Sequence, residues 1–471
     1  MPKHTSFLVL LFSIALSARL TFFFLVTPYE PSVQSNLILQ SDALGYHLLA
    51  QTLVKSHEFS YQEGGAPDCL RTPGYPLFIG FFYLLFGAKP WIPIFFQLFI
   101  DSASCVLLYE ILLKFSAHRI ALFSSLFYSF DPFLIFFSVT LLSEILFIFL
   151  LLVATFYFTK AIELNFNPPS KRAICIAGLF FGLATLVRPI SLYLIIIIPI
   201  FLCFFLRHNL RLFLTATFLF ATVFSFTISP WILRNFLSYD AGFLSTSGAY
   251  NLLMLYVSPM EAEKRGLSSR DAMEQLSHEV DSVIVRSGSH PSNLNAFQKS
   301  KHHTDLAIHY ILNNPTLFLK HYFLGIVHSF ASLGTKGFAE ALNLPTEEGY
   351  FDIKGHKSLW VTVTQFLNHK TFSEKVIGAT IFLYLLIEYF CLTIGIIVSW
   401  KLLNKRFLLF CLMLAAYFIL LAGPFGNARF RLPALPFYLV FIAVGLDILY
   451  SKMQGRHLRN QQSRQTTTIS L

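Results

Sequence analysis

The sequence predicts an all-α membrane protein with about ten transmembrane helices and with re-entrant or interfacial helices in its first and its long outer loops. Hydrophobic residues fill 55% of the 471 positions, charged residues only 13%, and 54 phenylalanines are present. A soluble domain normally carries about 25% charged residues. The mean hydropathy is +0.62, and apolar runs long enough to cross a bilayer recur along the chain.

The charge balance and the cysteines exclude several other classes of protein. The formal net charge is +10, but in a membrane protein a basic excess marks cytoplasmic loops. No nucleic-acid-binding motif is present, so no nucleic-acid partner is expected. Five of the six cysteines lie in apolar segments and only Cys69 lies in a loop. The spacing forms no CxxC pair, so cysteine does not indicate a redox compartment.

The first element is an apolar run at 6–26, preceded by Lys3 and His4. It predicts an uncleaved signal anchor with the N-terminus inside. Arg19, in its outer third, either extends toward the interface or faces a polar site. The next run, 75–88, is too short to span and predicts a re-entrant or interfacial helix.

Nine further spans complete the predicted ten. If 75–88 does not cross, the basic clusters near Lys114, Lys160 and Arg207 all fall inside, as the positive-inside rule requires. The apolar run 315–333 is interrupted by charged and histidine residues, which favours an interfacial helix. The expected spans are 90–113, 119–138, 141–161, 172–187, 189–206, 211–231, 376–400, 405–422 and 429–450.

The chain divides into four parts on this pattern. Residues 1–235 form an N-terminal transmembrane core that contains the first outer loop, 27–89. Residues 236–375 form an outer region of loops with helical patches rather than a separate soluble domain. Residues 376–450 form the last spans, and 451–471 form a basic inner tail that we expect to be unstructured.

A second pattern of charge lies at the predicted outer ends of the spans, opposite the positive-inside bias. The loop segment 41–76 carries Asp42, Asp68 and Arg71 and ends in a Thr-Pro-Gly-Tyr-Pro turn. Several other charged residues stand at span ends on the same side, and several of them come with helix-breaking prolines. These are Glu144, Arg188, Arg234, Arg429 and Arg431.

This rim of charges has a direct chemical interpretation. Arginines at a lipid–water boundary are suited to bind a phosphate carried by a lipid and to stabilise it as a leaving group. The predicted phosphate ligands are Arg71, Arg188, Arg234, Arg429 and Arg431. A nearby carboxylate can take the proton of an attacking hydroxyl. Asp42 and Glu144 are the candidates, and together they are also the only candidates to hold a divalent cation.

Each of these residues also has a structural interpretation. Asp42 could cap the helix that follows it, and Glu144, near a helix start, could interact favourably with the helix dipole. The arginines could bind lipid headgroups. The pair His302–His303 resembles half of a metal site, but no acid at helical spacing completes it. Asp101, inside a predicted span, is a buried acid that could pair with another polar group.

The motifs at the rim, taken together, resemble the C-type glycosyltransferases. The likeness covers roughly residues 6–450 and is to the bacterial branch grouped with the protein O-mannosyltransferases and the lipid A aminoarabinose transferase. The motifs are Asp42 with Tyr46, the turn Arg71 to Pro76 with Tyr75, Ser143–Glu144, Gly182 to Pro189, Pro230 to Asn235 and Ala428 to Pro433.

The resemblance implies inverting transfer of a sugar from a polyprenyl-phosphate donor to a lipid, glycan or protein acceptor. It implies a multi-pass protein of the bacterial inner membrane with its active site on the extracytoplasmic face. Asp42 would be the base, Glu144 would assist, and Tyr46 and Tyr75 would line the substrate groove. Many relatives carry a second acid after the first-loop aspartate, whereas here Ala43 follows, so a metal bridging such a pair does not carry over.

Two other classes of function remain open at this point. A transporter or flippase of a lipid-linked or small polar substrate would normally show repeat symmetry and polar breaks at the midplane. No repeat is visible in this chain, and Asp101 is the one feature that favours a transporter. A structural or assembly protein of the membrane is the third option, and no motif favours it.

Overall fold

The computed structural model describes residues 2–34, 38–161, 170–206, 208–347, 368–423 and 426–468. All regular secondary structure in these residues is helical, which confirms the predicted fold class. Eight helices in this part of the chain are long and apolar enough to cross a membrane, and nine if the bent pair α6–α7 counts as one span. Arg207, expected on the inner side, lies outside the described residues.

The spanning helices follow the predicted apolar runs closely. They are α1 (Pro2–Val26), α5 (Trp91–Leu113), α6 (His118–Phe130), α7 (Pro132–Ser138), α8 (Glu144–Ala161), α9 (Lys171–Val187), α10 (Leu194–Leu206, preceded by the 3-10 turn η2, Pro189–Ser191), α11 (Leu210–Tyr239), α19 (Phe372–Leu402), α20 (Lys405–Ala422) and α21 (Leu435–Thr468).

Helix α9 completes the predicted set of ten spans, and with 17 residues it is shorter than each of the eight candidate spans. At 1.5 Å per residue it extends about 26 Å, close to the thickness of a bilayer core. It packs between α8 and α11. Because α8 and α9 run antiparallel, the start of α8 and the end of α9 lie at the same end of the bundle.

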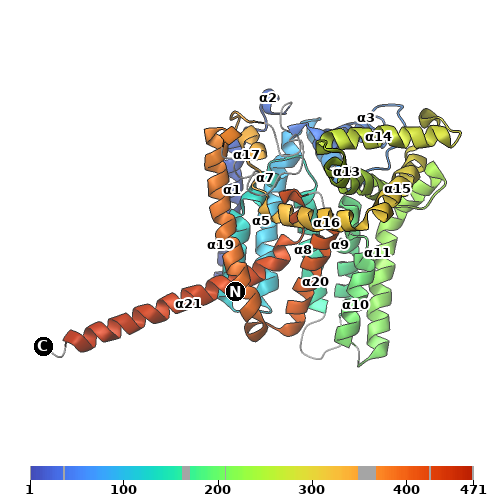
Figure 1. Ribbon diagram of the computed structural model, residues 1–471. Helices are drawn as coiled ribbons and strands as arrows, with labels where there is room; N and C mark the ends of the chain where they lie inside the picture. Colours follow the sequence, from blue (N-terminus) through green and yellow to red (C-terminus); the bar gives the residue numbers. More distant parts are fainter. Residues whose placement is uncertain are drawn as a thin grey trace.

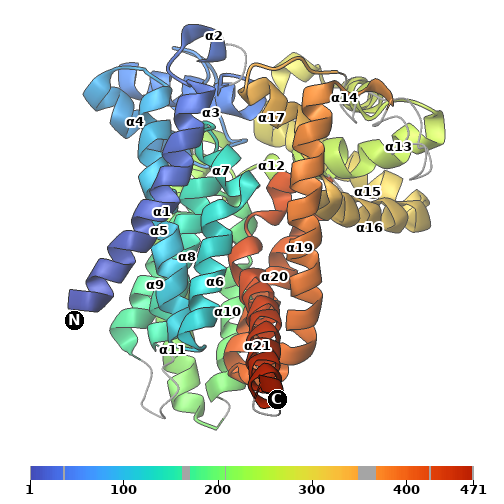
Figure 2. The same cartoon turned by 90° about the vertical axis from the view of Figure 1, so that its left-hand side faces the viewer.

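The remaining helices gather at this same end, which we call the loop end (Figures 1 and 2). They are α2 (Pro31–Val33), α3 (Ser41–Lys55), α4 (Gly74–Phe86), α12 (Ser247–Asn251), the π-helix η3 (Leu252–Val257), α13 (Ser258–Arg265), α14 (Ser269–Arg286), η4 (Pro291–Asn293), α15 (Ala296–Asn313), α16 (Pro315–Ala331) and α17 (Thr335–Ala341).

Helix α4 has the length expected of a non-spanning element, and α16 has the orientation of one. Helix α4 has 13 residues and is about 20 Å long, too short for a bilayer core of about 30 Å. Helix α16 runs across the bundle in both views, whereas α20 runs along it (Figures 1 and 2). The hydroxyls of Tyr256 and Tyr322 donate to carbonyls at the end of α20 and hold this layer against the spans.

The structure differs from two expectations, one about region 236–375 and one about the basic tail. Part of 236–375 is more ordered than a set of loops, because η3 and α13 to α15 enclose a small apolar core that includes Leu253, Met260 and Leu276. The amphipathic pattern of α14 accounts for this core. The basic tail, expected to be unstructured, continues α21 as a helix to Thr468 that leaves the bundle (Figure 1).

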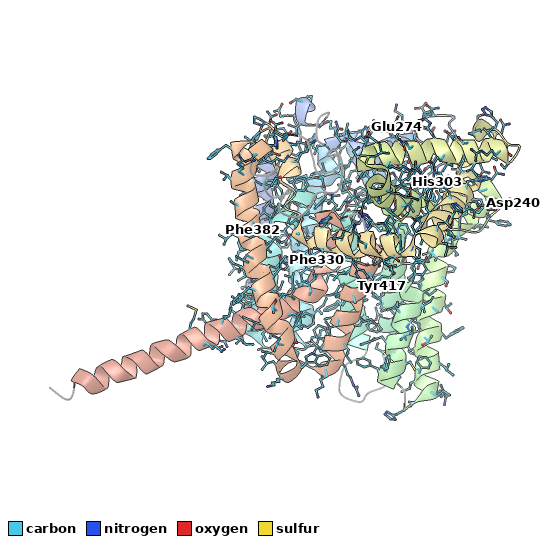
Figure 3. All side chains as sticks on the ribbon, in the orientation of Figure 1. Asp240, Glu274, His303, Phe330, Phe382 and Tyr417 are labelled. Atoms are coloured by element: carbon cyan, nitrogen blue, oxygen red, sulfur yellow. The ribbon has the colours of Figure 1, made fainter. Side chains whose placement is uncertain are left out.

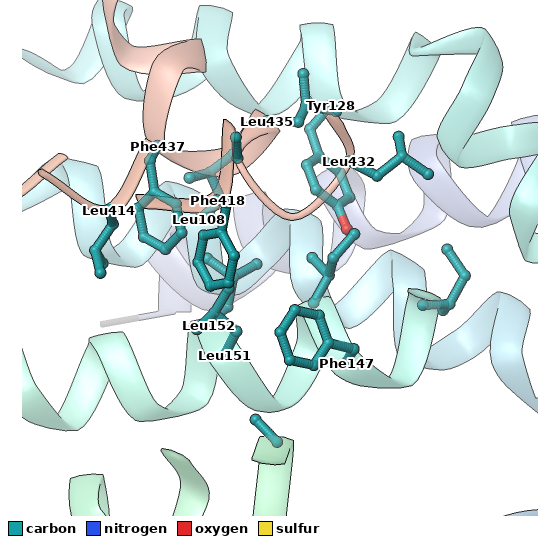
Figure 4. Packing of buried hydrophobic residues seen from close by; sticks show 14 of the residues in the cluster. Leu108, Tyr128, Phe147, Leu151, Leu152, Leu414, Phe418, Leu432, Leu435 and Phe437 are labelled. Carbon is teal, nitrogen blue, oxygen red and sulfur yellow. The ribbon is translucent and has the colours of Figure 1, made fainter. Parts of the chain in front are cut away.

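The apolar core of the bundle lies where α5, α8, α20 and the start of α21 meet (Figure 4). Leu151, Phe418 and Leu432 are fully buried there. Many other large apolar side chains point outward, such as Phe382 on α19, which is 59% exposed and is labelled in Figure 3. An exposed apolar belt of this kind is expected for helices whose solvent is lipid.

The buried acid Asp101 and Arg19 form an ion pair inside the bundle. Arg19 Nε donates to Asp101 Oδ2 at 2.6 Å, and the Tyr128 hydroxyl donates to Asp101 Oδ1 at 2.6 Å. Arg19 also donates to the Ser129 carbonyl at 3.0 Å. Arg19 therefore neither reaches the interface nor faces the polar rim. Because both oxygens of Asp101 are bonded, the feature that favoured a transporter has a structural role.

Candidate active site

Asp42 lies in the first turn of α3 at the loop end. The helix begins at Ser41 after Gln40, whose side chain makes no capping bond, so Asp42 is not the N-cap residue that its position suggested. Instead its carboxylate turns toward two arginines. Arg71 Nη2 donates to Oδ1 at 3.0 Å and Arg429 Nη1 donates to Oδ2 at 2.7 Å.

Asp68 fixes the turn that presents Arg71. Its carboxylate accepts the backbone N–H groups of Leu70 at 3.2 Å and of Arg71 at 3.0 Å. The sequence alone does not distinguish Asp68 from a solvent-exposed loop acid. An acid three residues before the arginine, in a turn, was the signal that could have revealed this local bond.

Arg188 reaches the site because α9 ends there. The residue precedes Pro189, which disfavours helical backbone at the preceding position, and Arg188 is extended with φ −141° and ψ 119°. Its guanidinium donates to Glu144, the first residue of α8, and to the Ser143 hydroxyl at 3.3 Å. The proline that ends α9 thus directs this side chain to the neighbouring helix.

Arg429 connects the two acids. It lies in the 3-10 helix η7 (Ala428–Arg431), where the Asn427 side chain accepts its backbone N–H at 2.9 Å. Its Nε donates to Glu144 and its Nη1 to Asp42. Five segments that are distant in sequence therefore converge in one network of two carboxylates and three guanidinium groups.

The two carboxylates differ in their access to solvent. The Asp42 side chain is 39% exposed, whereas that of Glu144 is fully buried. Burial by itself would raise the pKa of the Asp42 carboxyl, but the charges and hydrogen bonds of Arg429 and Arg71 outweigh it and hold the pKa well below its usual range. Asp42 is thus ionised and accessible, while Glu144 contacts arginines only.

Tyr46 and Tyr75 support Arg71 and do not line an open groove as predicted. Both rings are buried, with centroids 4.9 Å apart in an edge-to-face arrangement. The Arg71 guanidinium lies over the Tyr46 ring at 4.5 Å. The Tyr75 hydroxyl donates to Gln97, whose amide donates to the Thr140 carbonyl at 2.9 Å. Gln97 was missed, because a single amide inside an apolar run carries no positional signal.

Two of the predicted phosphate ligands lie in other clusters. Arg234 donates to the backbone carbonyls of Asp68 and Phe59 and lies over the Trp231 ring at 4.6 Å, so it fastens the first loop to α11. Arg431 is 2% exposed and faces away from Arg429. In a 3-10 helix, with three residues per turn, side chains two positions apart point in different directions.

Asp42 and Glu144 do not fit as joint ligands of a cation. The Arg429 guanidinium bonds both carboxylates, which places a fixed positive charge where a shared metal would bind. No cluster of three or more His, Cys, Asp or Glu side chains suited to a metal occurs in the described residues. His303 on α15, labelled in Figure 3, bonds the Lys299 carbonyl of its own helix.

A separate cavity lies between α1, α5 and α8. It has a volume of about 530 Å³ and an almost wholly apolar lining that includes Leu8, Phe12 and Phe149. No charged side chain lines it. Its position on α1, close to the N-terminus, puts it toward the end of the bundle opposite the loop end. It therefore takes no part in the polar site.

The fold and the site together define a polytopic α-helical membrane protein with arginine-bridged carboxylates at one end of its bundle. Residues 70–233 match the family model of dolichyl-phosphate-mannose-protein mannosyltransferases. This match includes Arg71, Glu144 and Arg188, and over that part it confirms the predicted resemblance to the protein O-mannosyltransferase branch. No curated protein sequence matches the chain.

Solved structures of two kinds of protein are similar to this chain. One is the archaeal oligosaccharyltransferase AglB from Archaeoglobus fulgidus, in complex with an inhibitory peptide and a dolichol-phosphate, with 15% identity, a TM-score of 0.49 and coverage of 95% of this chain and 52% of that one. The other is ArnT from Cupriavidus metallidurans bound to undecaprenyl phosphate, with 11% identity, a TM-score of 0.36 and coverage of 94% and 77%. The chain thus spans about half the length of the oligosaccharyltransferase.

Proposed function

We propose that the chain is a membrane glycosyltransferase that moves a sugar from a polyprenyl-phosphate donor to a lipid, glycan or protein acceptor. The observation that carries the proposal is the convergence of Asp42, Glu144, Arg71, Arg188 and Arg429 in one partly open cluster. The family match over residues 70–233, to enzymes that use dolichyl-phosphate mannose, supports the same chemistry.

The cluster has one more positive than negative charge, which suits it to an anionic group. Arg71 Nε is buried and has no hydrogen-bond partner, so it gains one if the side chain turns to a phosphate oxygen. Arg188 and Arg429 are shared with carboxylates and could turn to the phosphate as it arrives. Glu144, which contacts arginines and is shielded from solvent, acts as a positioning residue rather than as a base.

The reaction uses Asp42 as its base. An acceptor hydroxyl attacks the anomeric carbon of the sugar, its oxygen forms the new glycosidic bond, and its proton passes to Asp42. The bond between that carbon and the phosphate oxygen breaks, and polyprenyl phosphate leaves with its charge stabilised by the arginines. Attack from the face opposite the phosphate inverts the configuration. When the phosphate draws Arg71 or Arg429 away, the pKa of Asp42 rises and the carboxylate becomes a better base.

The site is proposed to face the extracytoplasmic side of a bacterial inner membrane. The loop end carries this cluster, whereas Lys160, Lys171, Arg211, Lys405 and Arg406 stand at the opposite ends of their helices. The positive-inside rule assigns that opposite end to the cytoplasm. A lipid-linked donor would then present its phosphate to the arginines at the outer boundary of the bilayer.

The proposal is tested by Asp42→Asn, which keeps the shape of the side chain and removes its basicity. A strain that lacks the gene is complemented with the wild type or the variant, and its envelope glycans and lipids are compared by mass spectrometry. We expect the variant to leave unrestored the glycan that the wild type restores, since loss of a general base slows a reaction by roughly 10²–10⁴-fold.

Asp305→Asn is the matched control, because Asp305 is an exposed acid on α15, away from the cluster. It should restore the glycan fully. Membrane abundance and melting temperature of both variants show whether the protein is folded. Full restoration by folded Asp42→Asn protein would exclude Asp42 as the base, and no glycan or lipid difference in the strain without the gene would exclude transferase activity.

A further inference from the structure

A second group of ionisable side chains lies inside the bundle, where α7, η7, α19 and α21 meet. Asp131 stands at the break between α6 and α7, which are bent by 52° relative to each other. Glu388 lies near the middle of α19, and Arg431 is at the end of η7. All three are at most 2% exposed. Neither Asp131 nor Glu388 belongs to the site described above.

Asp131 and Arg431 have hydrogen-bond partners in this group. Asp131 Oδ1 accepts the Leu134 N–H at 2.8 Å as the N-cap of α7, and Oδ2 accepts the Tyr384 hydroxyl at 3.2 Å. Arg431 Nη1 donates to the Phe330 carbonyl at 2.9 Å and to the Tyr389 hydroxyl at 2.7 Å. Phe330, on α16, is labelled in Figure 3. The Arg431 guanidinium also lies over the Phe133 ring at 4.4 Å.

Glu388 differs from both, because neither of its buried carboxylate oxygens has a hydrogen-bond partner. The Tyr438 hydroxyl lies near Glu388 and is likewise buried without a partner at hydrogen-bonding distance and angle. Arg431 also attracts Glu388 electrostatically but forms no ion pair with it within 4.0 Å. An ionised carboxylate without partners is strongly disfavoured in a membrane interior.

If Asp131 and Glu388 are both ionised, Arg431 balances only one of them and the cluster carries one excess negative charge. Asp131 is bonded as an acceptor by two donors, whereas Glu388 accepts none. Charged residues on the other helices around α19 are engaged elsewhere: Lys336 and Glu340 of α17 face Lys370 and Glu374 at the start of α19, and Asp447 of α21 pairs with Arg119. Neither Asp131 nor Glu388 forms an ion pair within 4.0 Å in the described part of the chain.

We propose that this cluster is a buried proton-binding site and that Glu388 holds the proton in the folded protein. A proton removes the excess charge and turns an unpartnered acceptor into a hydroxyl that can donate to the Tyr438 oxygen. A metal cation would be repelled by Arg431, whose Nη2 is also without a partner. The ligand is therefore a proton, and the site is separate from the carboxylates that bond Arg429.

The site bears on the reaction through η7. Arg431 in the proton site and Arg429 at the carboxylates are two residues apart on this one 3-10 turn. An ionised Glu388 would attract Arg431 more strongly than a protonated one. The proton thus keeps Arg431 on its Phe330 and Tyr389 partners and leaves η7 in the position that directs Arg429 to Asp42 and Glu144.

The test is an infrared measurement on the purified full chain in lipid, because only a protonated carboxyl shows a C=O stretch separate from carboxylate bands. At neutral pH the wild type should show this band, shifted in heavy water, and Glu388→Gln should lose it. The matched control is Glu374→Gln on the same helix. Glu374 is equally buried but is bonded to Lys370 at 2.8 Å, so the band should remain.

A second measurement is the melting temperature between mildly acidic and mildly basic pH. A carboxyl that keeps its proton when folded but loses it on unfolding destabilises the folded state progressively as pH rises above the usual glutamate range. The wild type should therefore lose melting temperature relative to Glu388→Gln as pH rises. A constant difference, or an infrared band that survives in folded Glu388→Gln protein, would overturn the proposal.

A substitute variant and a comparison of salts complete the test. If Glu388→Gln does not accumulate as folded protein, Glu388→Asp is measured instead. The band should then shift in frequency, and an unchanged band would assign the proton to another carboxyl and overturn the proposal. If the wild type lacks the band and melts at a higher temperature in sodium or potassium chloride than in choline chloride, the ligand is a metal cation and the proton assignment is wrong.

Discussion

At the scale of single residues, Arg429 decides the state of both acids in the site. Its guanidinium is shared between Asp42 and Glu144, so each carboxylate is ionised and fixed in direction before any substrate binds. Arg71 adds a second positive charge to Asp42 alone. The basicity of Asp42 therefore depends on how many arginines face it, which gives a test by substitution.

Arg71→Ala should shift the acidic limb of the pH dependence of kcat/KM to higher pH. A base must be ionised, so activity is lost as pH falls through its pKa. Removing Arg71 takes away a charge that lowers the pKa of Asp42, and the loss then begins at higher pH. Transfer rates measured across pH report this limb. Arg71→Lys keeps the charge and should leave the limb near its original position. An unmoved limb in Arg71→Ala would mean that another group is the base.

Gly45→Ala tests the placement of Arg71 by a steric change. A Cβ at Gly45 would lie 2.8 Å from Arg71 Nη2 and 2.9 Å from Nε, so the flexible guanidinium would move. Alanine favours a helix interior by about 1 kcal/mol over glycine. We expect an unchanged or higher melting temperature together with a raised KM for the donor.

Gly80→Ala in α4 is the control for that substitution. Its added Cβ would find its nearest neighbour, Val54 Cγ2, at 3.6 Å, which is an ordinary contact. Its KM for the donor should equal that of the wild type. Equal KM values in Gly45→Ala and Gly80→Ala would show that the observed position of Arg71 does not matter for donor binding.

At the scale of elements, breaks and close crossings of helices place the functional side chains. Pro189 ends α9, and Arg188 therefore turns toward α8. At the break between α6 and α7, Asp131 faces α19 and accepts the Tyr384 hydroxyl. Helices α19 and α21 approach each other at Gly395 and Gly445. Small residues permit such contact in membranes, where lipid supplies no hydrophobic force between helices.

Gly395→Ala should separate α19 from α21 and destabilise the bundle. The added Cβ would lie 1.7 Å from the Phe441 carbonyl oxygen, which is backbone and cannot turn away. We expect the free energy of unfolding to fall by about 3 kcal/mol, the upper part of the range for overpacking. Thermal unfolding in detergent measures it. Ile396→Ala, at a side chain 43% exposed to the lipid side, should change stability much less. Equal effects of the two would contradict the close crossing.

At the scale of the whole molecule, the arrangement depends on which helices cross the membrane. With α4 outside the bilayer core, α5 begins at the loop end and finishes at the opposite end. A topology reporter fused after Lys89 should therefore report an extracytoplasmic position, and one fused after Ser116 a cytoplasmic position. The reverse result would mean that α4 crosses, which would place the basic helix ends on the wrong side of the membrane.

The sequence by itself determined the helical class, most span limits and five members of the charged cluster. The length of an apolar run and the distribution of charge depend only on residues that are near in sequence. The sequence therefore indicates which charged residues stand at span ends, among them Asp42, Arg71, Glu144, Arg188 and Arg429. The direction of a side chain around its helix axis is not local. Arg234 and Arg431 stand at equivalent span ends but face other neighbours, and Tyr46 and Tyr75 became supports.

Only the tertiary structure shows which buried acids have a partner that stabilises their charge. Asp101 and Glu388 are both single acids in apolar runs, and composition does not distinguish them. Asp101 meets Arg19 and is satisfied, whereas Glu388 lies beside Arg431 without a bond. Their difference arises from packing between helices far apart in sequence, and in a bilayer core that packing decides whether a carboxylate is stable as an ion or must hold a proton.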